Sequence, residues 1–107
     1  MTTINHWIDN SQQLAELCEQ LRDATELAID TEFMRSDTFF AKLALIQLSD
    51  GEQCWLIDTP AIEQLQPLTA LLNGPQLTLV FHSCGEDLEV LDQVLSVRPK
   101  KLFDYQV

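Results

Sequence analysis

Basic residues are scarce in this chain of 107 residues, which holds 17 Asp and Glu against six Lys and Arg, for a formal net charge of −11. Proteins that bind nucleic acids contact phosphates mainly through Lys and Arg, so the composition alone argues against a nucleic-acid partner. A bound divalent cation reverses the local sign of the charge, however. An acidic chain that holds such a cation is therefore still compatible with phosphate binding.

Long apolar runs and paired cysteines are also missing. The apolar runs are only a few residues long, far short of the roughly 20 that cross a bilayer, and the first residues lack the basic and apolar regions of a signal peptide. Three cysteines, Cys18, Cys54 and Cys84, are odd in number and match no disulfide or zinc spacing. We therefore expect reduced thiols in a cytoplasmic protein that has no membrane partner.

Two acids interrupt an otherwise apolar segment, Leu27-Ala28-Ile29-Asp30-Thr31-Glu32-Phe33. In a strand, residues i and i+2 point to the same face, so Asp30 and Glu32 would lie side by side, about 7 Å apart along the strand. Two like charges at this spacing repel each other, and a divalent cation commonly offsets that cost. A strand with a solvated acidic face is the alternative interpretation, because the D-x-E pattern alone is weak.

The pattern of apolar residues predicts a mixed sheet with flanking helices. Residues 26–34, 42–48 and 53–58 read as an antiparallel meander, with an Asp-Gly hairpin turn at Asp50-Gly51 and a second strand apolar enough to be covered on both faces. A strand–helix order in the second half predicts parallel strands. The remaining expected elements are strands at 5–8 and 77–81 and helices at 11–23, 60–72 (kinked or split by Pro67) and 85–95.

A third acid lies on the last predicted helix. Its apolar residues, Leu88, Val90, Leu91, Val94 and Leu95, fall on one face at ~100° per residue, and Asp87 projects from the middle of that apolar stripe. Burying an unpaired carboxylate costs several kcal/mol, so Asp87 requires an arginine, backbone N–H groups or a metal as a partner. Local capping at the start of the helix is the alternative.

Together, the acid pair and Asp87 are typical of a two-metal phosphodiesterase site. Two divalent ions about 4 Å apart clamp the scissile phosphate, and carboxylates are the ligands that magnesium and manganese prefer.

These motifs resemble those of the ribonuclease D family in the DEDD superfamily of 3′–5′ exonucleases. Ala28-Ile29-Asp30-Thr31-Glu32-Phe33 is similar to the first exonuclease motif, and the segment from His82 to Leu91 is similar to the second. Between them, Phe39 to Gly51 resembles the family's aromatic pair, apolar strand and hairpin, and Leu102 to Val107 resembles a later strand. The resemblance implies an α/β, ribonuclease H-like fold.

The resemblance also implies an activity and its participants. Asp30, Glu32 and Asp87 would be the catalytic residues and would bind two Mg²⁺ or Mn²⁺ ions. The substrate would be RNA 3′ ends, tRNA precursors among them, and the products nucleoside 5′-monophosphates. Candidates for contacting the nucleic acid are Phe33, Phe39, Phe40 and His82, for which core packing or a structural role is the alternative.

The sequence departs from the family in one respect. The third motif, with an aspartate and a water-orienting tyrosine one turn before it, would lie beyond residue 107, and neither Asp104 nor Tyr105 has the required spacing. We therefore expect residues 1–107 to form a partial exonuclease domain without a carboxy-terminal nucleic-acid-binding domain, inactive alone and with an open sheet edge that favours self-association. A non-catalytic binding module and a DNA-directed exonuclease remain the alternative functions.

Overall fold

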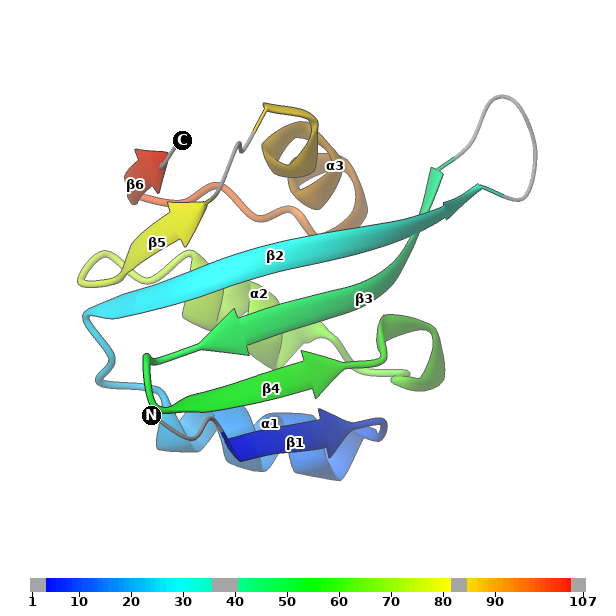
Figure 1. Cartoon of the computed structure of the whole chain (residues 1–107), viewed down its shortest axis with the longest axis horizontal. Coiled ribbons are helices and arrows are strands. Elements are labelled where there is room, and N and C mark those ends of the chain that lie inside the picture. Colours follow the sequence, from blue (N-terminus) through cyan, green and yellow to red (C-terminus); the bar gives the residue numbers. More distant parts are fainter. Residues whose placement is uncertain (1–3, 36–40, 82–84, 105–107) are drawn as a thin grey trace.

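One mixed sheet with the strand order β1-β4-β3-β2-β5-β6 runs through the molecule (Figure 1). The computed structural model describes residues 4–35, 41–81 and 85–104. In chain order the elements are β1 (Ile4–Ile8), α1 (Ser11–Gln20), β2 (Glu26–Arg35), β3 (Ala41–Ser49), β4 (Gln53–Ile57), the 3₁₀ turn η1 (Thr59–Ala61), α2 (Gln66–Leu72), β5 (Thr78–Phe81), α3 (Gly85–Leu95) and β6 (Lys101–Asp104).

The strand directions confirm the predicted mixture. The strands β2, β3 and β4 form the antiparallel meander, whereas β1 pairs with β4, β5 with β2, and β6 with β5 in parallel. The β3–β4 turn is the expected Asp-Gly hairpin, in which Gly51 has a φ of 99° that L residues rarely adopt. One carboxylate oxygen of Asp50 accepts the N–H groups of Glu52 (2.9 Å) and Gln53 (2.8 Å) and closes the turn.

The three helices pack against the same face of the sheet. Three connections join parallel strands through a helix: β1-α1-β2, β4-α2-β5 and β5-α3-β6. All three run in the same direction along the strand order. Because such crossovers are right-handed, the three helices lie on one side of the sheet. Figure 1 shows α1 and α2 behind the strands. The core between these layers joins residues of every helix to alternate residues of the strands, among them Leu14, Leu68, Leu91, Ile29, Ile46 and Phe81.

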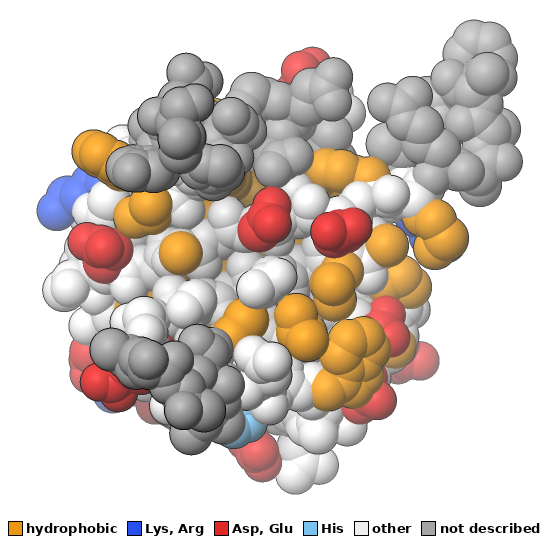
Figure 2. Space-filling view, viewed as in Figure 1, with side chains coloured by type: hydrophobic (Ala, Val, Ile, Leu, Met, Phe, Trp, Pro, Cys, Tyr) orange, Lys and Arg blue, Asp and Glu red, His pale blue; other side chains and the backbone are white. Residues whose placement is uncertain are grey.

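The opposite face, which we call the open face, is not covered by any helix in the described part of the chain. Its β2 residues Ala28, Asp30 and Glu32 are exposed, whereas the intervening Leu27 and Ile29 are buried in the core. The expectation that β3 is covered on both faces is therefore wrong, because Gln47 of β3 is exposed beside Asp30. Figure 2 views this face and shows acidic side chains over the middle of β2 with hydrophobic ones around them.

The bounds of α3 are those predicted, whereas those of α1 and α2 differ from the predicted ones for local reasons. Asn10 begins α1 by accepting the N–H of Gln13 with its side chain (2.8 Å), and the helix ends at Gln20 rather than at residue 23. Pro67 splits the predicted second helix, since it occupies the first turn of α2, where a missing N–H costs nothing. On α3, Leu91 is fully buried but Val94 is 49% exposed, so the apolar stripe is narrower than predicted.

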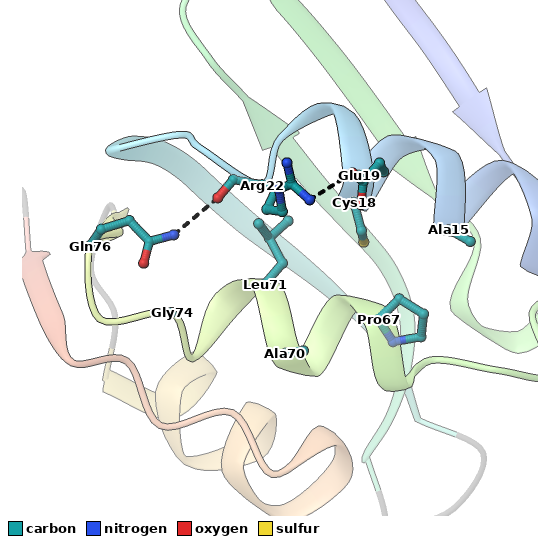
Figure 3. A pocket seen from close by; sticks show the side chains of 9 residues that line it. All are labelled: Ala15, Cys18, Glu19, Arg22, Pro67, Ala70, Leu71, Gly74 and Gln76. Carbon is teal, nitrogen blue, oxygen red and sulfur yellow. Dashed lines mark hydrogen bonds and ion pairs between the residues drawn. The ribbon is translucent and has the colours of Figure 1, made fainter.

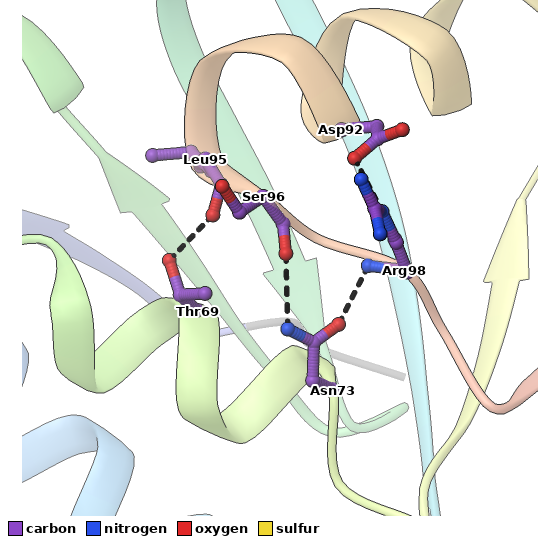
Figure 4. A network of polar contacts seen from close by, with 6 residues as sticks. All are labelled: Thr69, Asn73, Asp92, Leu95, Ser96 and Arg98. Carbon is purple, nitrogen blue, oxygen red and sulfur yellow. Dashed lines mark hydrogen bonds and ion pairs between the residues drawn. The ribbon is translucent and has the colours of Figure 1, made fainter.

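The ends of α2 and α3 are joined by side-chain hydrogen bonds (Figure 4). The Asn73 amide donates to the carbonyl of Ser96 (3.0 Å) and accepts the N–H of Arg98 (2.6 Å), while the Thr69 hydroxyl donates to the carbonyl of Leu95 (2.8 Å). Ser96 ends α3 with a φ of 56°. None of the helices in the described part of the chain has the length and apolar character needed to cross a membrane.

Candidate active site

Asp30 and Glu32 occupy the middle of β2 on the open face. Both side chains are exposed, and β2 pairs Asp30 with Gln47 and Glu32 with Leu45 of β3. Because the strand alternates and the ladder is regular up to Glu32, the two carboxylates project from the same side of the sheet, as the sequence predicts. A register shift follows between Glu32 and Phe33. The acid pair thus ends the regular part of the β2–β3 ladder.

A local hydrogen bond orients the first acid. One carboxylate oxygen of Asp30 accepts the N–H of Thr31 at 3.0 Å. Beside Asp30 the open face is hollowed into a shallow pocket of about 230 Å³, whose mostly apolar lining includes Ala28, Val80 and Phe81 together with the polar Gln47 and Ser49. The pocket leaves space next to a carboxylate, which is the arrangement that a ligand or cation requires.

Gln47 is a site residue that motif reasoning missed. It faces Asp30 directly across the β2–β3 ladder and lines the pocket, so its amide lies next to the carboxylate. The signal that would have found it is the hairpin register, because directly opposite residues in an antiparallel pair have neighbouring side chains. Fixing that register requires the position of the shift after Glu32, which the apolar pattern does not reveal.

The topology brings the start of α3 to the end of β5, the same end of the sheet at which the acid pair lies. The strand β5 ends at Phe81, which pairs with Ile29, and α3 begins four residues later at Gly85, so the chain leaves β5 next to the point where β2 continues with Asp30. In Figure 1 α3 lies beside the part of β2 that extends past β5. Asp87 is in the first turn of α3, but its side chain is outside the described part of the structure. Its convergence with Asp30 and Glu32 therefore remains a prediction.

Of the four residues predicted to contact nucleic acid, the structure describes one. Phe33 is half-buried and packs against the core, on the side of the sheet away from Asp30 and Glu32. Phe39, Phe40 and His82 lie outside the described residues. A role for any of the four in contacting nucleic acid stays a prediction.

The carboxylate pair fits a hard divalent cation in its chemistry. Oxygen ligands on one exposed face are what Mg²⁺ and Mn²⁺ prefer, and Asp30 and Glu32 supply them. Among the side chains that the structure describes, no group of three His, Cys, Asp or Glu is close enough to share a metal ion. A complete site would thus need at least one further ligand besides this pair, and Asp87 is the predicted one.

A second cavity, between α1 and α2, has a different character (Figure 3). It measures about 280 Å³ and is lined by Cys18, Arg22 and Leu71 among others. Burial raises the pKa of the Cys18 thiol to about 11, so the sulfur is protonated at neutral pH and a poor nucleophile. Arg22 is held by Glu19 at 3.0 Å. This cavity therefore shows no reactive group.

The family model described as 3′–5′ exonuclease matches residues 5–107. The chain belongs to the 3′–5′ exonuclease family. This confirms the family that the sequence motifs indicated.

Within the 3′–5′ exonucleases, this chain is similar to ribonuclease D. It is 42% identical to ribonuclease D of Pseudomonas paraeruginosa over 94% of its length and 43% identical to that of Escherichia coli, also over 94%, and it spans 27% of each relative. The crystal structure of Escherichia coli RNase D superimposes with a TM-score of 0.86 and 41% identity over 97% of this chain and 27% of that one. This match confirms the ribonuclease H-like fold.

A more distant structure has the same fold. The Trypanosoma brucei RNase D complex with RNA U12 gives a TM-score of 0.83 at 21% identity, over 96% of this chain and 38% of that one. The chain thus spans about a quarter of the length of the curated relatives that it matches.

Proposed function

We propose that this chain is the amino-terminal part of a metal-dependent 3′–5′ exoribonuclease of the ribonuclease D type. The observation that carries the proposal is the pair of exposed carboxylates that β2 presents on the open face, Asp30 and Glu32, within a chain of the exonuclease family. The similarity to ribonuclease D supports RNA as the substrate, and a related structure is an RNA complex. In this proposal the RNA is shortened from its 3′ end, tRNA precursors included, with release of nucleoside 5′-monophosphates.

Asp30, Glu32 and Asp87 are the residues that would hold two divalent ions, Mg²⁺ or Mn²⁺. When bound, such ions lower the pKa of the attacking water and stabilise the leaving oxygen. The chain itself contributes by holding the carboxylates of Asp30 and Glu32 in position. Asp30 is oriented by the N–H of Thr31, and β2 fixes the separation between Asp30 and Glu32 because both lie on one strand. The pocket beside Asp30 leaves room for part of a substrate.

The charge of the chain is consistent with this assignment. At a net charge of −11 the protein repels RNA phosphates as a whole, so the proposal requires cations at the open face to attract the substrate. RNA binding should then depend on the divalent cation rather than on the few Lys and Arg.

We further propose that residues 1–107 are a partial catalytic domain that needs a fourth carboxylate and a water-orienting tyrosine from a further segment. The cytoplasm is the proposed location, which the unpaired thiols of Cys18 and Cys54 support. Self-association through the β6 edge is proposed as well, since Leu102 and Phe103 there are 42% and 54% exposed.

A chimaera tests the activity. In it, this chain replaces the matching quarter of Escherichia coli ribonuclease D, so that the remaining groups come from the relative. We expect the chimaera to degrade RNA with a free 3′-hydroxyl in the presence of Mn²⁺, and Asp30→Asn to reduce the rate by at least about 100-fold. Glu26→Gln is the matched control, an exposed acid on the same face of β2, and should keep the activity.

Undiminished cleavage by the Asp30→Asn chimaera would remove the assignment of Asp30. A folded chimaera that cleaves DNA 3′ ends faster than RNA 3′ ends would favour the DNA-directed alternative.

A further inference from the structure

In the part of the chain that the structure describes, the strand β1 forms one edge of the sheet and has backbone groups without a partner. It pairs with β4 alone, in a register that is continuous from Ile4 to Ile8 (Figure 1). The carbonyl of Ile8 accepts the N–H of Asp58 at 2.8 Å, so the backbone of Ile8 faces β4. Because successive residues of a strand direct their backbone groups to opposite sides, the N–H and C=O groups of Asn5 and Trp7 point away from the sheet. Two residues of β1 can therefore pair with a further strand.

Within the described residues 4–8, this edge has none of the usual features that prevent such pairing. Natural edge strands are protected by Lys, Pro or a bulge. At the other edge, β6, the exposed Lys100 and Lys101 lie only at the start of the strand, so they leave Leu102 and Phe103 open to the self-association proposed above. By contrast, β1 has the sequence Ile-Asn-His-Trp-Ile and no register shift, and Trp7 is 52% exposed. The β1 edge is thus open to an added strand.

A groove runs along this edge on the helical side of the sheet. It has a volume of about 460 Å³ and lies between β1 and α1, with Gln13, Glu16 and Gln20 on the helix side. Its floor is fixed, since the His6 ring stacks on Trp55 with centroids 6.1 Å apart and its Nε2 atom lies 2.8 Å from Oε1 of Gln53. Among the described residues that line the groove, Glu16 is the only one with a formal charge. The groove is therefore preformed, polar and negative.

We propose that β1 and this groove bind an extended peptide in which basic and apolar residues alternate. The peptide would form hydrogen bonds with Asn5 and Trp7 and add to the sheet as a seventh strand. Its basic side chains would enter the groove towards Glu16. Its apolar side chains would lie on the open-face side against Trp7, which shares that face with Leu56 and Gln47 through the strand register. The proposal does not depend on the exonuclease activity.

Hydrogen exchange with a defined peptide tests the proposal. The probe is an end-capped octapeptide of alternating Lys and Val, added to the 107-residue chain while amide exchange is followed by NMR. We expect saturable binding and slower exchange of the Asn5 and Trp7 amides by at least about tenfold, with no change for His6 and Ile8, which already face β4. The same peptide with N-methyl groups on alternate residues should not bind, because it lacks the N–H donors that strand pairing needs.

Two charge-reversal variants test the groove. Glu16→Lys should weaken binding of the Lys-Val peptide at least about tenfold, whereas Glu63→Lys, an exposed residue outside the groove with the same change in net charge, should leave it unchanged. The proposal is overturned if the peptide does not bind, if the N-methylated peptide binds equally well, or if both variants weaken binding alike, which is the result of non-specific attraction to an acidic protein. It is also overturned if the Asn5 and Trp7 amides are already protected in the free chain through self-pairing.

Discussion

Ile29 of β2 and Phe81 of β5 are the last residue pair of the parallel ladder between these two strands. Beyond this pair β2 continues into Asp30, whereas the chain leaves β5 and begins α3 at Gly85. Residues that are more than 50 positions apart in the sequence are thereby brought to one place on the sheet. This is the general position of ligand sites in sheets with parallel strands, outside the carboxyl ends of the strands.

Metal binding by the chain itself should depend on an acid of β2 and on an acid of α3. In calorimetric titrations with Mn²⁺, we expect Asp30→Asn and Asp87→Asn each to weaken binding at least about tenfold, because each removes a charged oxygen ligand. Glu26→Gln and Asp92→Asn are the matched controls on the same strand and the same helix. Equal affinity for the parent chain and Asp87→Asn would exclude Asp87 as a ligand while leaving the Asp30–Glu32 pair in place.

The 107-residue chain alone should hydrolyse RNA only marginally. The proposed mechanism needs a fourth carboxylate and a tyrosine that orients the water, and groups that act together in a catalytic site are not additive, so loss of one removes most of the rate. The measurement is release of nucleoside 5′-monophosphates from a 3′-hydroxyl RNA in Mn²⁺, with the chimaera as the positive control. Rates comparable to those of the chimaera would contradict the prediction.

Replacing Ser96 by glycine should stabilise the protein. Ser96 ends α3 with a φ of 56°, a region that costs an L residue roughly 1–2 kcal/mol but costs glycine little. Glycine also loses more backbone entropy on folding than serine does, which offsets part of this gain. We therefore expect the free energy of unfolding, measured in urea, to rise by roughly 0.5–1 kcal/mol. Ser96→Ala is the matched control and should bring no gain, because alanine keeps the same backbone penalty.

Loss of the Asn73 side chain should destabilise the junction of α2 and α3. Its amide makes two hydrogen bonds to the backbone at the end of α3, with the carbonyl of Ser96 and the N–H of Arg98. At roughly 0.5–1.5 kcal/mol for each bond, Asn73→Ala should lower the free energy of unfolding by about 1–2 kcal/mol. Asn73→Asp keeps the acceptor for Arg98 but loses the donor, so it should cost less than the alanine variant. If Asn73→Ala lowers the free energy of unfolding no more than a neutral surface substitution does, the hydrogen bonds of Asn73 do not stabilise this junction.

The hairpin acid Asp50 should contribute its full stability above its ordinary pKa and lose it as the pH falls further. Hydrogen bonds from the N–H groups of Gln53 and Glu52 hold the pKa of this carboxyl below the usual 3.8. A carboxyl whose pKa is lowered by folding stabilises the native state when ionised, and this contribution is lost as the pH falls through the folded-state pKa. The stability difference between the parent chain and Asp50→Asn should therefore be largest near neutral pH and shrink below about pH 4. A difference that is constant with pH would contradict this origin.

The amino-acid sequence determined the local features of this protein because they depend on neighbouring residues. The D-x-E spacing placed Asp30 and Glu32 on one face through strand alternation, and Asp50-Gly51 specified the hairpin through a backbone conformation that glycine tolerates. The strand order could be anticipated in part, since the meander and the parallel strands follow from the order of elements. The ends predicted for the first two helices were less accurate, because packing against the rest of the protein decides where a helix ends.

Only the tertiary structure decided which face of the sheet is covered. The apolar run of β3 suggested burial on both faces, but the three right-handed crossovers move in one direction and place every helix on the same side, which leaves Gln47 exposed next to Asp30. The pairing of Ile29 with Phe81, the register shift after Glu32 and the unpaired edge of β1 likewise depend on contacts between distant residues. No local pattern encodes them, because they arise when the strands assemble.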